Sequence, residues 1–124
     1  MLHEAESDAL NRELERWEEW ISCSIAQAEV LRASRLAASQ PQRAPDDRLV
    51  ERAERVLRRI GLIDADSSLL DSASRVDPVR LRTLDAIHLA AALSLGDEVG
   101  AMFTYDRRLA DAARKYGLEI LSPA

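Results

Sequence analysis

The sequence predicts a single α/β domain with a mostly parallel sheet. Short apolar runs typical of strands alternate with helical patterns of about ten or more residues, an order that favours parallel strands joined by helices. Gly96 and Gly117 follow two of these patterns, where a helix commonly ends. The 124 residues are enough for one hydrophobic core, so no second domain needs to be sought. In such a sheet, ligands bind at the carboxyl ends of the strands.

The first third of the chain combines two predicted helices with one strand. An apolar stripe predicts a helix over residues 5–17 that packs one face on the sheet. The members of this stripe are Leu10, Leu14, Trp17 and Ile21. Residues 20–23 form a predicted strand. Ser24 and Gln27 have capping-box spacing, so we expect the next helix to begin at once and to continue to about residue 38.

A linker separates this part from a third predicted helix. Residues 39–45 contain two prolines and form the clearest linker of the chain. Asp46 is expected to cap the helix that follows, because aspartate is favoured at that position. Gly61 is expected to end it in a left-handed conformation.

The remaining elements are apolar runs between turn residues. Residues 62–63 are a strand candidate and residues 67–74 a short helix, before Asp77 and Pro78 interrupt the chain. The last third then predicts a helix, a strand, a helix and a strand. Their predicted ranges are residues 84–95, 101–104, 106–116 and 118–121.

Charge, cysteine content and apolar stretches argue against several classes of protein. The formal net charge is −5, from 22 acidic and 17 basic residues, which argues against binding nucleic acid by simple charge attraction. Cys23 is the only cysteine, so no intramolecular disulfide can form. The apolar stretch around residues 89–95 is too short to cross a bilayer. We therefore expect a cytoplasmic protein.

Three acidic residues occur near predicted strand-to-helix junctions or helix starts. Glu29 lies on the helix that follows Ser24, Asp85 in the first turn of an apolar helix, and Asp106 where a strand meets its helix. At one edge of a parallel sheet they would form a carboxylate cluster able to hold Mg²⁺ or Mn²⁺ for phosphodiester hydrolysis. Thr104 could fix a metal-bound water or a phosphate oxygen by hydrogen bonding.

Each of these residues also has a structural interpretation. Asp106 is a good N-cap, and Asp85 in a first turn is favoured by the helix dipole. Glu29 can be a half-exposed helix residue. Arg107 and Arg108 can be solvated helix residues, although beside Asp106 they are placed to meet a nucleic-acid backbone. Spacing alone leaves the structural and the catalytic interpretations open.

At these positions the sequence resembles a known family. Residues 84–92, LDAIHLAAA, followed by residues 103–109, FTYDRRL, resemble the C-terminal signature of bacterial PIN domains of the VapC family. Residues 24–32, SIAQAEVLR, resemble the segment around that family's second acid. The resemblance implies a three-layer α/β/α sandwich and an endoribonuclease that requires Mg²⁺ or Mn²⁺. It also implies an RNA substrate and a cognate VapB-like antitoxin that blocks the site.

Site residues follow from the resemblance position by position. Glu29, Asp85 and Asp106 match the family's second, third and fourth acids, whose role would be metal coordination, and Thr104 matches its hydroxyl position. The family's first strand, which ends in the first metal-binding Asp, has no counterpart before Glu4. We therefore expect residues 1–124 to be a single PIN-like domain that lacks this strand, with the missing strand encoded upstream.

The leading functional prediction is a toxin-like ribonuclease, with a homodimer as a possible assembly and no membrane partner. A PIN-like module that is catalytically impaired and binds antitoxin or RNA is the first alternative. A PIN nuclease of RNA processing is the second. An upstream gene for a small DNA-binding antitoxin would favour the toxin.

Overall fold

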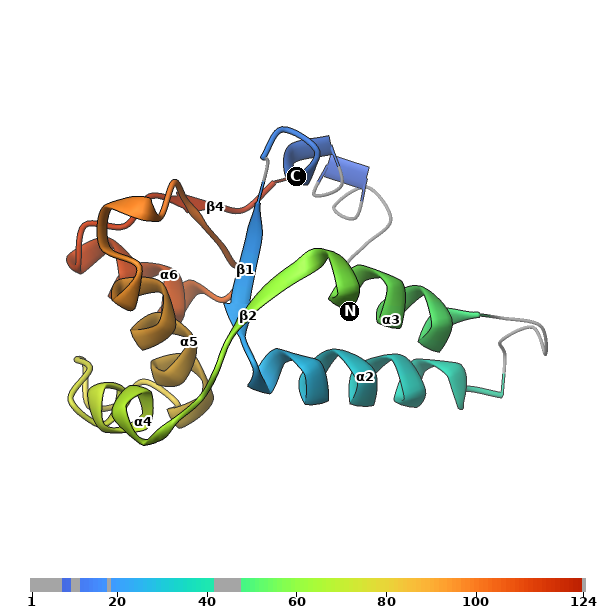
Figure 1. Cartoon of the computed structure of the whole chain (residues 1–124), viewed down its shortest axis with the longest axis horizontal. Coiled ribbons are helices and arrows are strands. Elements are labelled where there is room, and N and C mark those ends of the chain that lie inside the picture. Colours follow the sequence, from blue (N-terminus) through green and yellow to red (C-terminus); the bar gives the residue numbers. More distant parts are fainter. Residues whose placement is uncertain (1–7, 10–11, 18, 42–47, 124) are drawn as a thin grey trace. The chain divides into compact units, whose positions relative to one another are not determined.

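The computed structural model describes residues 8–9, 12–17, 19–41 and 48–123 (Figure 1). The chain forms two compact units, one of residues 19–64 and one of residues 1–18 with 65–124. Parts of the predicted first helix are described: residues 8–9 and 12–14 are helical. Residues 1–7, where the absence of a first strand was predicted, lie outside the described part.

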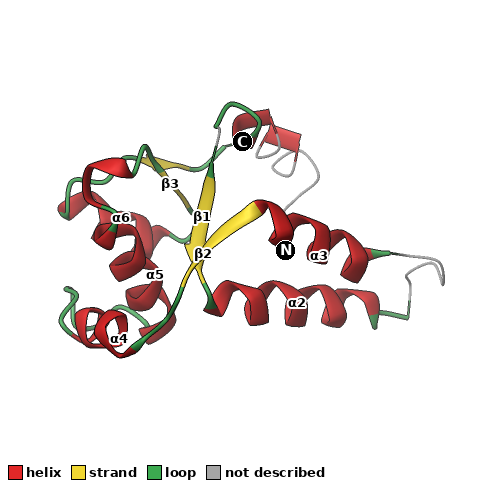
Figure 2. Ribbon diagram, in the orientation of Figure 1, coloured by secondary structure: helices red, strands yellow, loops and turns green. Residues whose placement is uncertain are grey.

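The unit of residues 19–64 contains two strands and two helices. Strand β1 (Trp20–Cys23) leads into helix α2 (Ile25–Ala38), and helix α3 (Leu49–Arg59) leads into strand β2 (Ile60–Ile63). The two strands pair in parallel with Trp20 opposite Ile60, and α2 and α3 lie side by side (Figure 2). The predicted strand over residues 20–23 and the end of α2 are confirmed.

The prediction of a capping box at Ser24 is wrong. Ser24 has φ −58° and ψ −24°, and its side chain makes no cap hydrogen bond. An N-cap residue needs an extended backbone to direct its side-chain oxygen at the first turn, and Ser24 is already helical. Its amide instead donates to the Ile63 carbonyl at 2.8 Å, which extends the contact between the two strands by one residue.

The prediction that Gly61 ends the third helix is also wrong. The helix ends at Arg59, and Ile60 has extended angles, φ −98° and ψ 129°. Gly61 therefore belongs to β2 and lies opposite Ile21. The chain passes from helix to strand without a left-handed residue. Asp46, the predicted cap, lies outside the described residues, and Arg48 directly precedes α3.

The second unit carries all the helices and strands that follow residue 64. Helix α4 (Ser67–Ser74) and helix α5 (Thr83–Ser94) are followed by a 3-10 turn at Gly96–Glu98, strand β3 (Met102–Phe103), helix α6 (Arg107–Lys115) and strand β4 (Ile120–Leu121). Strands β3 and β4 pair in parallel. The predicted helices are confirmed, and Gly96 and Gly117 have positive φ of 57° and 88° at the ends of α5 and of α6.

Both described strand pairs are parallel, and strands alternate with helices, so the predicted α/β class is confirmed. Among the described residues the strands form two ladders of two strands each. None of the described helices has the length and hydropathy to span a membrane.

The core of the second unit combines many alanines with a few leucine and isoleucine side chains. Leu89 of α5 is fully buried. Helix α6 contacts α5 and β4. It buries one face, made of Leu109, Ala110, Ala112 and Ala113. Alanines on a buried face permit close approach of neighbouring elements, so the two helices and the strand ends beside them are held at short range.

Trp17 packs on strand β3 and on the segment that precedes it. Its ring meets Phe103 edge to face, with ring centroids 6.2 Å apart. Trp17 also packs against Gly100, two residues before the strand. An edge-to-face aromatic pair adds about 0.5–1.5 kcal/mol to the burial of its surface, so these contacts help to fix the strand that leads to Thr104.

Candidate active site

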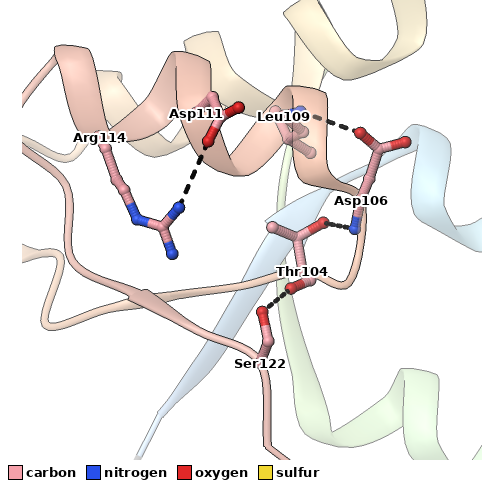
Figure 3. Close-up of polar contacts among 6 residues, drawn as sticks. All are labelled: Thr104, Asp106, Leu109, Asp111, Arg114 and Ser122. Carbon is pink, nitrogen blue, oxygen red and sulfur yellow. Dashed lines mark hydrogen bonds and ion pairs between the residues drawn. The ribbon is translucent and has the colours of Figure 1, made fainter.

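Asp106 lies at the junction between β3 and α6, and hydrogen bonds fix its orientation. Its Oδ1 accepts the Leu109 amide at 2.9 Å, so the predicted N-cap role is confirmed. Its own amide donates to Oγ1 of Thr104 at 3.1 Å, and the Ser122 hydroxyl donates to the Thr104 carbonyl (Figure 3). With Oδ1 held by the helix, Oδ2 is the carboxylate oxygen left for a ligand.

Asp85 lies in the first turn of α5 and is half buried. It lines one open pocket of about 250 Å³ together with Asp106, so the structure brings together two of the three predicted acids. Each acid lies at a helix N-terminus, where the helix dipole favours negative charge. The pocket therefore holds two carboxylates at positions where a helix terminus favours negative charge.

Three arginines line the same pocket, namely Arg82, Arg107 and Arg108, together with Leu81. Arg107 and Arg108 are the first two residues of α6, directly after Asp106. Groups of both signs therefore line the pocket, three guanidinium groups beside two carboxylates, although the chain as a whole is acidic. The charge argument against binding phosphates therefore does not apply to this pocket.

Arg82 is the site residue that sequence reasoning missed. It precedes α5 with extended angles, φ −60° and ψ 146°, in the N-cap position, and Asp85 is the third residue of the helix. The N-cap residue and the third residue of a helix are neighbours across its first turn. This spacing is the signal that could have identified Arg82 once the start of α5 had been located.

The loop before Arg82 is held by two hydrogen bonds. The Leu81 amide donates to the Pro78 carbonyl at 2.9 Å, and the Asp77 amide donates to the Tyr116 hydroxyl at 2.9 Å. Tyr116 follows α6 directly. The second bond therefore connects the loop before α5 with the residue that follows α6.

Glu29 belongs to the other unit. It is an exposed residue of α2, a helix that buries none of its side chains. In the part of the chain that the structure describes, no three His, Cys, Asp or Glu residues are grouped so that they could hold a metal ion. The cluster of Glu29, Asp85 and Asp106 stays a prediction, and Asp85 with Asp106 is the pair that shares a pocket.

The two carboxylates fit the requirements of a hard divalent cation. Mg²⁺ and Mn²⁺ prefer oxygen ligands, and Mg²⁺ is commonly held by one or two carboxylates with water and substrate phosphate completing its shell. Asp85 and Asp106 supply such oxygens in an open pocket. The arginines beside them supply donors for the phosphate groups of a substrate.

Both a family model and individual known proteins match most of the chain. A family model described as the PIN domain matches residues 2–115. Ribonuclease VapC46 of Mycobacterium tuberculosis (strain ATCC 25618 / H37Rv) is 38% identical over 123 residues, which cover 99% of this chain and 88% of that protein. Ribonuclease VapC35 of the same strain is 35% identical over 124 residues, which cover 97% and 86%. No solved structure gives a significant match.

The family match spans both the segment that carries Glu29 and the segment that carries Asp85 and Asp106. The resemblance of residues 84–92 and 103–109 to PIN-domain motifs is thereby confirmed at the level of the family. Since the family model covers most of the sequence and the relatives align along nearly its whole length, the chain belongs to the PIN-domain family.

Proposed function

We propose that this protein is a metal-dependent endoribonuclease of the VapC type, the toxin of a toxin–antitoxin pair. The observation that carries the proposal is the shared pocket of Asp85 and Asp106, lined by arginines, in a PIN-domain chain. The relatives named as ribonucleases support the choice of RNA as substrate. Mg²⁺ or Mn²⁺ is the proposed cofactor, because the available ligands are carboxylate oxygens.

Asp85 and Asp106 would hold the metal ion, and Glu29 is proposed as a third ligand from the family match. When bound, the ion would neutralise charge on the scissile phosphate and activate water for attack. Asp106 presents Oδ2 while Oδ1 stays on the Leu109 amide. The Thr104 oxygen accepts the Asp106 amide, which leaves its hydroxyl hydrogen for a water or a phosphate oxygen.

The arginines would bind the RNA backbone. Arg107 and Arg108 lie on the first turn of α6 and Arg82 lies at the start of α5, so all three line the same pocket as the two acids. Arginine can bind phosphate through two parallel hydrogen bonds, which fixes orientation as well as charge. We assign these three residues to positioning the phosphates next to the cleaved bond.

The test is cleavage of a mixed-sequence RNA oligonucleotide by the purified chain. Cleavage should stop in EDTA and return on adding Mg²⁺ or Mn²⁺. Asp85→Asn should reduce the rate of RNA cleavage by about 10- to 100-fold or more, because disturbing a metal site typically has an effect of this size. Asp111→Asn is the matched control, because Asp111 is an exposed acid of α6 bound to Arg114 and does not line the pocket. Undiminished cleavage in EDTA would refute the proposal.

The proposed partner is a small VapB-like antitoxin whose basic side chain enters the pocket. Its binding should weaken when Asp85 and Asp106 are both replaced by Asn, because a cation in the pocket would lose both counter-charges. Calorimetric titration with a VapB-like antitoxin measures the change. An unchanged affinity in the double variant would contradict this mode of inhibition. Homodimer formation is a separate proposal that light scattering of the purified chain tests.

A further inference from the structure

A short segment after α6 holds the main chain that leads to Asp106. The Met102 amide donates to the Glu119 carbonyl at 2.8 Å, and the Thr104 amide donates to the Leu121 carbonyl at 3.3 Å. The Ser122 hydroxyl then donates to the Thr104 carbonyl (Figure 3). Both main-chain polar groups of Thr104 are therefore bound by residues 121 and 122, next to the candidate site.

The next residue is bound to the same segment by its side chain. The Tyr105 hydroxyl donates to the Pro123 carbonyl. The third residue, Asp106, donates its amide to the Thr104 hydroxyl oxygen. Residues 104–106 are thus fixed one after another: Thr104 and Tyr105 by residues 121–123, and Asp106 by Thr104.

This arrangement matters for the Asp106 carboxylate because only one of its oxygens is engaged in the helix cap. Oδ1 accepts the Leu109 amide, and Oδ2 remains for a cation. The direction of Oδ2 depends on the backbone of residues 104–106, which the Ser122 and Tyr105 bonds restrain. Partners behind a metal ligand commonly set its orientation, and their loss costs about 10- to 100-fold in metal affinity or activity.

We propose that Ser122, together with Tyr105, is a positioning residue for the Asp106 carboxylate. Neither residue lines the pocket, so each acts through the main chain of residues 104–106. Ser122 fixes the Thr104 peptide, and the Thr104 hydroxyl in turn fixes the Asp106 amide. This inference rests on the proposed function, because it assigns Asp106 to metal binding.

The experiment compares four single variants of the full chain with the wild type. Ser122→Ala removes the hydroxyl, and Ser122→Thr keeps a hydroxyl at the same position. Tyr105→Phe removes the bond to Pro123 while the ring remains. Ser74→Ala is the matched control, because the Ser74 hydroxyl is also exposed and also donates to a main-chain carbonyl, that of Asp71 in α4.

Three measurements are made on each variant: Mn²⁺ affinity by calorimetry, the dependence of RNA cleavage on Mn²⁺ concentration, and hydrogen exchange of the Leu109 amide. Ser122→Ala should raise the Kd for Mn²⁺ about tenfold, and the Mn²⁺ concentration that gives half-maximal cleavage should rise by the same factor. The KM for RNA should stay within about twofold of the wild-type value. Leu109 exchange should accelerate. Ser122→Thr should keep all three values close to those of the wild type. Tyr105→Phe should change them in the same direction as Ser122→Ala does. Ser74→Ala should change none of them.

Equal Mn²⁺ affinity in Ser122→Ala and Ser74→Ala would overturn the positioning role while leaving the proposed function intact. A general loss of stability would lower the active fraction without changing the Mn²⁺ requirement, and it too would count against positioning. If the wild type binds no Mn²⁺ and cleaves no RNA, the proposed function fails and the metal-positioning role fails with it. The exchange of the Leu109 amide then still shows whether Ser122 holds the Asp106 cap.

Discussion

Trp17 lies so close to Gly100 that a Cβ at residue 100 would come 2.1 Å from Cζ3 of the indole ring and 2.7 Å from its Cη2. The same ring packs edge to face on Phe103, in the strand that leads to Thr104. The absence of a side chain at residue 100 is therefore a condition for the packing of Trp17 on that strand.

Gly100→Ala should destabilise the protein by about 1–3 kcal/mol, because the indole ring would have to shift to admit the methyl group. Urea denaturation measures this change. Gly61→Ala is the control: its Cβ would meet Ile21 at an ordinary 3.6 Å, and Gly61 does not have a positive φ. We expect Gly61→Ala to stay within about 0.5 kcal/mol of the wild type. Equal midpoints for the two variants would refute the packing argument.

The structural and functional roles of Asp106 can be separated with a second helix cap. Asp66 caps α4 as Asp106 caps α6, and each accepts its helical amide at 2.9 Å. Asp66→Ala and Asp106→Ala should each cost about 1 kcal/mol of stability, and the Asn variants much less, because asparagine caps almost as well. Only the Asp106 variants should lose RNA cleavage. Equal activity of Asp66→Asn and Asp106→Asn would contradict a role of Asp106 in the site.

Metal binding should stabilise the folded protein. A ligand that binds only the native state at a concentration 100 times its Kd adds about 2.7 kcal/mol. We therefore expect Mn²⁺ to raise the melting temperature of the wild type and of Asp111→Asn, and EDTA to reverse the effect. Asp85→Asn and Asp106→Asn should show little or no increase. A similar increase in all four proteins would indicate that Mn²⁺ binds elsewhere.

Arg82→Ala should weaken RNA binding without changing the cleavage site. Loss of one phosphate contact reduces the slope of log affinity against log salt by about 1, and weakens binding nearly equally for different sequences. Arg80→Ala is the matched control, since Arg80 is an exposed arginine of the same loop that does not line the pocket. Fluorescence anisotropy at several salt concentrations measures the affinity for RNA and its dependence on salt. Identical salt slopes for the two variants would show that Arg82 does not contact the RNA.

The elements that sequence predicted best are those whose signals are local. Helix α4 begins at Ser67 because Asp66 caps it, and α6 begins after Asp106 for the same reason. Glycine was informative where the backbone needs a positive φ, at Gly96 and Gly117. Gly61 shows the limit of this signal. Strand pairing with β1 determines its conformation, and that pairing is a long-range contact that composition does not reveal.

The same distinction applies to the candidate site. Asp85 and Asp106 could be selected from their positions at helix starts, because strand-to-helix order places such residues at one edge of a sheet. The bonds of Ser122 and Tyr105 to the site could not be predicted, because they depend on the register of β4 against β3. Arg82 required the exact start of α5, and helix boundaries are the least predictable property of a sequence.

Helix α6 has one face made of Leu109 and three buried alanines and another made of charged residues. Substitutions that enlarge the alanines would separate α6 from its neighbours, because these side chains are buried. The exposed positions, among them Arg107, Arg108 and Arg114, are free to change without a cost in packing. If Arg107 and Arg108 bind RNA as proposed, a change of charge along the exposed side of this one helix would alter the RNA preference, while the acid that begins the helix stays in place.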